Sequence, residues 1–228
     1  MADVIDIAGI PVTLRRSARA RRMTLRIARI GGEVTLTLPG RIARREAEAF
    51  ARGNADWIAR QVAAVPAPRG VAVGGTIPLG GRDVPVIAGT GRAARWTGAA
   101  IAVPDDRHAA RRVRLLVREL ARSHLVAAVS EHAGALGKVP GRITLRDTRS
   151  RWGSCSGRGD LMFSWRLAMA PPAILDYVAA HEVAHLVHMD HSPRFWACVA
   201  GLMHDYAPRR AWLRREGAAL HAVRFDRT

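Results

Sequence analysis

Residues 177–185 read YVAAHEVAH, and this stretch decides how the surrounding chain folds. Four residues of an α-helix advance by about 400°, so His181 and His185 project from one face, about 6 Å apart along the axis. Two imidazoles placed in this way can converge on one cation. Glu182 is offset by about 100° and can reach a water on that cation without binding the cation itself. The stretch therefore predicts a helix with a zinc site and a general base.

A third zinc ligand is expected at His191. Catalytic zinc takes three protein ligands and keeps one position open. If the helix continued, the side chain of His191 would point about 240° away from His185. Ser192-Pro193, however, has the pattern of an N-cap followed by proline in the first turn of a new helix. The chain therefore turns before His191, and this turn can bring His191 back to the site.

Other side chains are open candidates near this site. Glu216 is the alternative third ligand. Cys155 is the alternative fourth ligand, although a free packing thiol is the favoured interpretation. Candidates for contact with substrate or with the metal ligands are Trp152, His188 and Tyr206. Packing in the core is the competing interpretation for the tryptophan and the tyrosine.

The charge balance of the 228-residue chain is strongly basic, with 36 lysines and arginines against 19 acids and a net charge of +17. Lys138 is the single lysine. A charge of this size raises non-specific affinity for nucleic acid or anionic surfaces, but no recognition motif accompanies it. Nucleic acid is therefore a candidate partner besides a protein or peptide substrate, and the oligomeric state stays open.

The expected localisation is cytoplasmic. The chain has two cysteines, Cys155 and Cys198, which argues against a disulfide framework. No apolar run approaches the roughly 20 residues of a membrane span, so no membrane partner is expected. The first residues, MADVID, have two early acids and lack the apolar core of a secretory signal.

Residues 1–104 are predicted to form a β-rich accessory domain with one helix. Val34, Leu36 and Leu38 alternate on one face of an expected strand, which Pro39-Gly40 ends. The expected helix covers residues 44–65 and stops at a proline-rich stretch. The expected strands of this half are residues 12–16, 23–30, 33–38, 76–79, 83–87 and 100–103.

Residues 105–228 are predicted to form a largely helical domain with a small sheet, so the fold class is α+β. A long helix begins at a cap on Asp105 or Asp106 and ends near residue 135. The other expected elements are strands at 143–146 and 161–167 and helices at 171–188, from 193 and from 208. Residues 161–167 could bind an extended peptide by strand addition if they form the edge of the sheet.

Several motifs of the second half are shared with a known family: SRWGSCS at 150–156, WRL at 165–167, DYV at 176–178, HEVAH at 181–185 and HSPRFW at 191–196. The chain resembles the YgjP-like metallopeptidases, relatives of the SprT-type proteases, most densely over residues 142–212. The resemblance implies a zincin-like core, in which the edge strand of a small sheet lies beside the active-site helix. It implies Glu182 as the base and, as zinc ligands, His181, His185 and His191.

Two positions differ from the pattern of these relatives. His188 stands where the related HExxHxxGxxH pattern has glycine, and Ser164 stands where asparagine is expected. The turn between the second and third histidines is therefore expected to differ from that of the related proteases.

The leading prediction is a zinc-dependent metallopeptidase that hydrolyses peptide bonds with a zinc-bound water activated by Glu182. A zinc-dependent hydrolase of nucleotide phosphoanhydrides is the first alternative, because arginines suit polyphosphate. Gly74-Gly75 and Gly80-Gly81, however, have the pattern of hairpin turns and not of a phosphate-binding loop. The remaining alternatives are a DNA-associated protease of the SprT type and a zinc module without catalysis.

Overall fold

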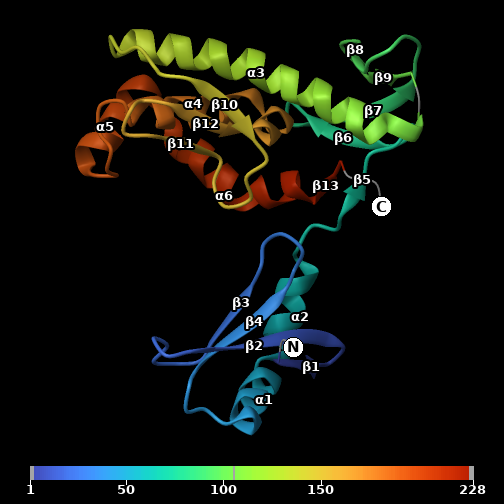
Figure 1. Ribbon diagram of the computed structural model, residues 1–228, viewed down its shortest axis with the longest axis vertical. Coiled ribbons are helices and arrows are strands. Elements are labelled where there is room, and N and C mark those ends of the chain that lie inside the picture. The colour runs from blue at the N-terminus through green and yellow to red at the C-terminus, as the bar shows by residue number, and fades with distance from the viewer. Residues whose placement is uncertain (1–2, 105, 226–228) are drawn as a thin grey trace. The chain divides into compact units, whose positions relative to one another are not determined.

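The computed structural model describes residues 3–104 and 106–225, which form an α+β fold with several small sheets and six α-helices (Figure 1). The α+β class that the sequence predicts is therefore confirmed. The chain divides into two compact units, Met1–Pro68 and Arg69–Thr228, and each has its own buried core. None of the helices in the described ranges has the length and apolar character that crossing a membrane requires.

The first unit contains a four-stranded sheet of order β1-β2-β4-β3. β2 (Ile10–Ser17) pairs antiparallel with β1 (Asp3–Ile7) and parallel with β4 (Val34–Pro39). β3 (Thr24–Ile27) pairs antiparallel with β4. Successive side chains of a strand point to opposite faces, so alternate residues of β4 are buried, as the sequence predicts: Val34, Leu36 and Leu38.

The helix expected over residues 44–65 is two helices, α1 (Arg44–Gly53) and α2 (Ala55–Ala63). Asn54 leaves the helical region between them, with φ −112° and ψ 14°, and its side-chain amide donates to the Phe50 carbonyl at 2.8 Å. Glycine and asparagine are poor helix formers, and asparagine competes for backbone hydrogen bonds, so the helix breaks at Gly53 and Asn54. Both helices contribute buried residues to the core of this unit.

The second unit begins at Arg69, whereas the predicted boundary between domains lies near residue 104. It contains a four-stranded sheet, order β6-β7-β9-β8, built from β6 (Thr76–Leu79), β7 (Arg82–Ala88), β8 (Arg95–Trp96) and β9 (Ile101–Val103). Apolar residues of these strands share one core with the helices that follow, and Ile77, Val86 and Ile101 lie in the same cluster as Val113 and Val117.

A three-stranded sheet of order β10-β12-β11 lies near the candidate site. β12 (Leu161–Ser164) is parallel to β10 (Ile143–Arg146) and antiparallel to β11 (Gly153–Cys155). The strand expected over 161–167 stops at Ser164, because the chain turns into a 3-10 helix, η2 (Trp165–Met169). β12 is also central, with its backbone paired on both sides. Residues 161–167 therefore do not form the edge of the sheet, which was the condition for binding a peptide by strand addition. β11 is an edge strand instead.

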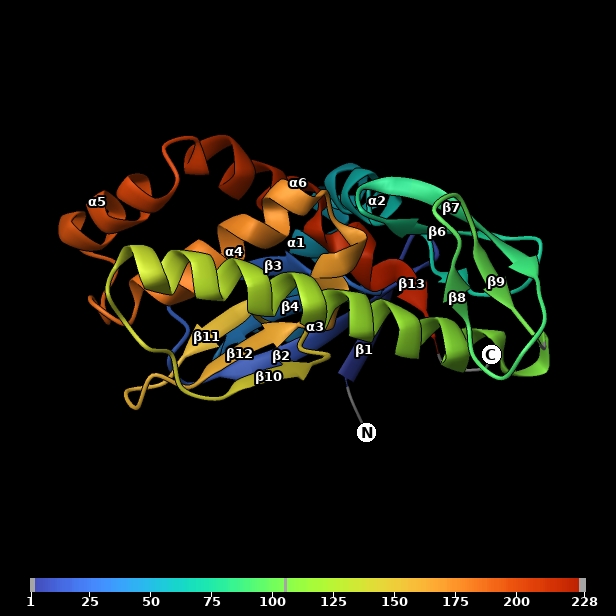
Figure 2. The same cartoon turned by 90° about the horizontal axis from the view of Figure 1, so that it is seen from above.

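α3 (Ala109–Ala135) runs along the second unit, with the β6–β9 sheet near its first turns and the β10–β12 sheet beside its second half (Figures 1 and 2). Its predicted end is confirmed. The expected cap differs: Asp105 lies outside the described residues, Asp106 belongs to a short 3-10 helix (Asp106–His108), and the residue at the N-cap is His108.

α4 (Pro172–Ala184) carries the HEVAH motif, with proline in its first turn. It ends before the expected residue 188, because the amides of residues 186–188 fold back in turns to the carbonyls of Val183 and Ala184. α5 (Pro193–Leu202) follows, and its predicted cap is confirmed: the Ser192 hydroxyl accepts from the Phe195 amide at 3.4 Å.

The last helix, α6 (Tyr206–Ala222), leads into a short strand, β13 (Val223–Arg224). β13 pairs in parallel with β5 (Arg69–Gly70), the first strand of the same unit. The start and the end of the second unit are therefore hydrogen-bonded to each other.

Candidate metal centre

Three histidines from α4 and the turn after it come together. His181 lies in the last turn of α4, His185 follows at its C-cap, and His191 stands just before α5. One ring nitrogen from each lies within 4.8 Å of the others, and the Nε2 atoms of His181 and His191 are 3.1 Å apart. Within residues 3–104 and 106–225, this is the one group of three or more histidine, cysteine, aspartate or glutamate side chains with a spacing that could hold a metal ion.

Two aromatic side chains of α5 support these rings. Phe195 is fully buried; it stacks on His185 with a centroid distance of 4.4 Å and meets His181 edge-on at 4.9 Å. The Trp196 ring lies 5.6 Å from His181 and 5.8 Å from His191. The cap at Ser192 starts α5 at the position from which both aromatic rings reach the histidines.

The backbone of His188 orients His185. Nδ1 of His185 donates to the His188 carbonyl at 2.9 Å, since a carbonyl can only accept. Nε2 of His185 then carries the lone pair, which is the arrangement that a metal-binding imidazole needs. His188 thus acts through its main chain, which any residue in this turn could do, while its side chain lies outside the histidine group.

The three histidines fit a metal ion. Burial, together with the charges of the nearby His185, His191 and Arg210, lowers the pKa of His181 to about 3. Burial also lowers the pKa of His185. Both imidazoles are therefore neutral at pH 7, with a lone pair available. Tetrahedral zinc with bonds of roughly 2.0–2.1 Å separates its ligands by about 3.4 Å, close to the distance between the Nε2 atoms of His181 and His191.

Glu182 is 5 % exposed and lies against β11. A Cβ atom at Gly153 would fall 2.5 Å from Oε1 and 2.6 Å from Cγ of Glu182, so only glycine leaves room for this side chain. Burial raises the pKa of Glu182 to about 8, against the opposing charge of Arg151. A carboxyl group with a pKa near neutrality is suited to taking up and releasing a proton.

Trp152 and Tyr206 both make packing contacts. The Trp152 ring lies 4.8 Å from His221 and so close to Gly217 that a Cβ atom there would be 2.9 Å away. Trp152 therefore joins the start of β11 to α6. Tyr206 stacks on Trp196 at 5.4 Å, and Trp196 in turn contacts the histidines.

Cys155 and Glu216 do not belong to the histidine group. The thiol of Cys155 donates to the Ser156 carbonyl at 3.4 Å, and burial raises its pKa. Glu216 accepts from Arg215 Nε at 2.7 Å. The third histidine, and neither alternative, is thus the side chain that the fold brings to His181 and His185. Ser164 is fully buried with its hydroxyl unpartnered, and nothing in the structure explains its presence in place of asparagine.

Two residues at the site were missed by the sequence analysis. Tyr177 is buried with its ring 5.9 Å from His181, and burial raises its pKa to about 12. The guanidinium of Arg210 lies 4.4 Å from the Trp196 ring centre. Tyr177 lies one helical turn before His181, which is a signal that the sequence contained, whereas Arg210 is one arginine among many.

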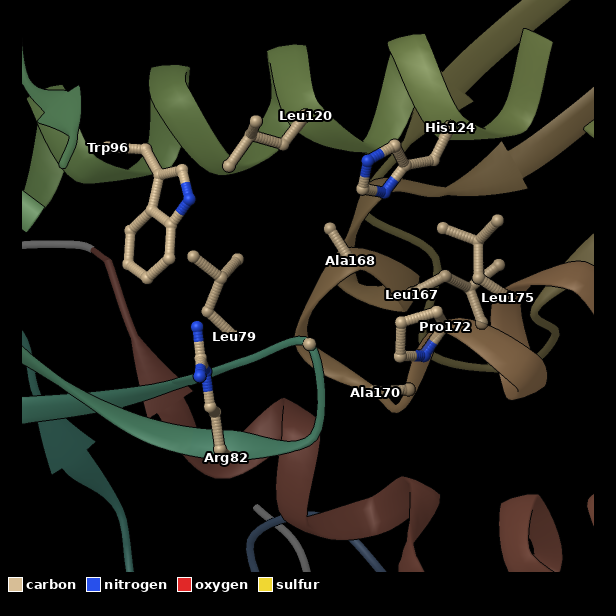
Figure 3. A pocket seen from close by; sticks show the side chains of 11 residues that line it. Leu79, Arg82, Trp96, Leu120, His124, Leu167, Ala168, Ala170, Pro172 and Leu175 are labelled. Carbon is tan, nitrogen blue, oxygen red and sulfur yellow. The ribbon is translucent and has the colours of Figure 1, made fainter. Parts of the chain in front are cut away.

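A separate hollow of about 400 Å³ lies between α3, the β6–β7 hairpin and the start of α4 (Figure 3). Arg82 and Trp96 lie on one side of it, with the guanidinium 5.6 Å from the indole ring centre, and Leu120 and His124 of α3 line another side. None of the three grouped histidines lines this hollow, so it is not part of the candidate metal centre.

Three comparisons with known proteins gave one match. The model of a family described as YgjP-like, metallopeptidase domain, matches residues 21–216, which is most of the chain. No curated protein and no solved structure matches the chain.

Proposed function

Because the chain belongs to the YgjP-like metallopeptidase family, we propose that it is a zinc-dependent peptidase with a zincin-like core. The observation that carries the proposal is the grouping of three imidazoles at the end of α4, where the buried carboxyl group of Glu182 follows His181 in the chain. Three nitrogen ligands with one open position form a ligand set of catalytic zinc.

Zinc held by the histidines would supply a Lewis acid that acidifies water and polarises a carbonyl group. Glu182 accepts the proton of the attacking water and returns it to the leaving amine. Gly153 leaves room for the carboxyl group, and the His188 carbonyl holds His185 with Nε2 directed to ligation. β11 is an edge strand beside Glu182, so an extended substrate paired with β11 would lie along the site.

The test compares zinc-loaded wild-type protein with Glu182→Gln on denatured protein substrates. We expect zinc to stay bound and the rate to fall at least about 10²-fold, because loss of a general base typically costs 10²–10⁴-fold. Glu119→Gln, an exposed change on α3, is the matched control and should keep the rate. His185→Ala should lose the zinc. Hydrolysis that survives in Glu182→Gln would remove the assignment of Glu182 as base.

We further propose a cytoplasmic enzyme that associates with nucleic acid. Both thiols are free, which suits a reducing compartment. Four exposed arginines recur at helical spacing on one face of α3: Arg111, Arg114, Arg118 and Arg122. Duplex DNA should bind at 50 mM salt and bind much more weakly at 200 mM. The logarithm of the binding constant should fall less steeply with the logarithm of the salt concentration when these four arginines are changed to glutamine. Binding no tighter than that of a neutral protein would remove this partner.

A further inference from the structure

A second hollow, of about 410 Å³, lies along the first half of α6. It is lined by Tyr206, Ala207, Arg210, Ala211, Arg214 and Arg215. Three of these six residues are arginines and none is an acid. Arg215 is already paired with Glu216 at 2.7 Å, whereas Arg210 lies over the Trp196 ring.

Trp196 joins this hollow to the metal centre. Tyr206 stacks on one side of the indole at 5.4 Å, and the Arg210 guanidinium lies 4.4 Å from the ring centre. The same indole lies 5.8 Å from the His191 ring. Arg210 is therefore at most about 10 Å from a metal-binding ring, a distance that roughly three extended residues span.

The chemistry of the hollow selects for anions. A guanidinium presents a rigid fork of donors that matches a carboxylate, and such charge-assisted hydrogen bonds are stronger than neutral ones. Arg210 is half-buried and its guanidinium lies against the indole, so it loses less side-chain freedom on binding than a fully exposed arginine would. A basic substrate side chain would meet the like charge of Arg210 there.

We propose that this hollow is a specificity site for an acidic side chain, aspartate or glutamate, within about three residues of the cleaved bond, and that Arg210 determines the preference. The inference rests on the proposed peptidase function and names the class of substrate that the site would take.

The experiment digests a denatured protein mixture with the zinc-loaded full chain and reads the cleaved bonds by mass spectrometry. Cleavage near Asp or Glu should exceed cleavage near Asn or Gln by about tenfold, since a hydrogen bond to a charged group contributes about that factor. Arg210→Gln should abolish the preference. Arg210→Glu should reverse the preference, so that cleavage near Lys and Arg becomes favoured. Loss of packing against Trp196 alone would not produce this reversal. Arg60→Gln, which removes the same charge from an exposed position of α2, should keep the preference.

A binding measurement separates this inference from the proposed function. Zinc-loaded Glu182→Gln is titrated with labelled peptides that carry one Glu, one Gln or one phosphoserine, with and without Arg210→Gln. Tighter binding of the Glu peptide, lost with Arg210→Gln, supports the inference even if no peptide is hydrolysed, in which case the proposed function fails. Hydrolysis with equal use of Glu and Gln peptides overturns the inference and leaves the peptidase. Tight binding of the phosphoserine peptide alone also overturns it.

Discussion

At the scale of the residue, Glu182 depends on the absence of a side chain at Gly153. Gly153→Ala would place a methyl group 2.5 Å from Oε1, so the carboxyl group has to move. We expect kcat/KM to fall by about 10²-fold, because displacement of a catalytic group by about 1 Å has that effect. Zinc content should stay at the wild-type level, since the histidines lie on other positions of the chain. Peptide hydrolysis and elemental analysis on the same sample measure both.

A glycine of the neighbouring turn provides the control for this prediction. A Cβ atom at Gly157 would meet nothing within 4 Å, so Gly157→Ala makes the same chemical change without a clash. It should keep wild-type activity. Equal activity of the two variants would show that Glu182 is not held by β11.

A second residue-scale prediction concerns His221, which is buried against Trp152. Burial, aided by the charge of Arg166, lowers its pKa to about 4, below the value of about 6.5 for an unfolded chain. Between these values the unfolded chain binds the additional proton, so His221 weakens the fold as pH falls from 6.5 to 4. Within this range, the loss that His221 causes in the free energy of unfolding approaches about 1.4 kcal/mol per pH unit.

Denaturant unfolding at pH 7.5 and pH 5 measures whether the free energy of unfolding falls with pH in this way. The wild type should lose more stability between the two pH values than His221→Gln, which cannot titrate there. His204→Gln, an exposed substitution, should behave like the wild type. The same loss in all three proteins would place the titrating group elsewhere.

At the scale of the element, Arg166 of η2 fixes the end of α6. Its guanidinium is buried, forms two hydrogen bonds with Asp147, at 2.6 and 3.1 Å, and donates at 2.8 Å to the carbonyls of Leu220 and Val223. Arg166→Met would leave the two carbonyls unpaired, and we expect a loss of about 2–4 kcal/mol in the free energy of unfolding, because each buried acceptor without a partner costs about 1–3 kcal/mol. Arg166→Lys lacks the fork of donors and should recover only part of it.

Urea unfolding measures this loss, with Arg118→Met as the control on an exposed face. That substitution should change stability by less than about 0.5 kcal/mol. If Arg166→Met changed stability as little as this control, the C-terminal end of α6 would not depend on Arg166.

Elements with a local cause could be predicted from the sequence. The start of α4 at a proline, the cap at Ser192 and the alternation in β4 each depend on a few neighbouring residues. The grouping of the histidines is also local, since it needs one helix and one turn. The contact of Gly153 with Glu182 and the approach of Arg210 to Trp196 depend on segments distant in the chain, and no spacing encodes them.

At the scale of the whole molecule, the compact units divide at Arg69, whereas the sequence analysis predicts a boundary near residue 104. The strands before residue 104 differ in character from the helices after it, but a boundary follows shared burial and not the type of element. The side chains that β6, β7 and β9 contribute to the core that they share with α3 are Ile77, Val84, Val86, Ile101 and Val103. Burial of each contributes roughly 2 kcal/mol, so together they contribute on the order of 10 kcal/mol, as much as the net stability of a typical domain.

Two truncated chains distinguish these boundaries. The fragment 69–228 retains the whole core and the β5–β13 pair, so we expect it to unfold cooperatively and to bind about one zinc per chain. The fragment 105–228 retains all three histidines but exposes the face of α3 that carries Val113 and Val117. It should show no cooperative thermal transition and should bind zinc weakly, because an unfolded chain does not hold the site together. Circular dichroism and elemental analysis measure both properties. A cooperative, zinc-loaded 105–228 fragment would show that the helices and the three-stranded sheet suffice, and that the strands before residue 104 are accessory after all.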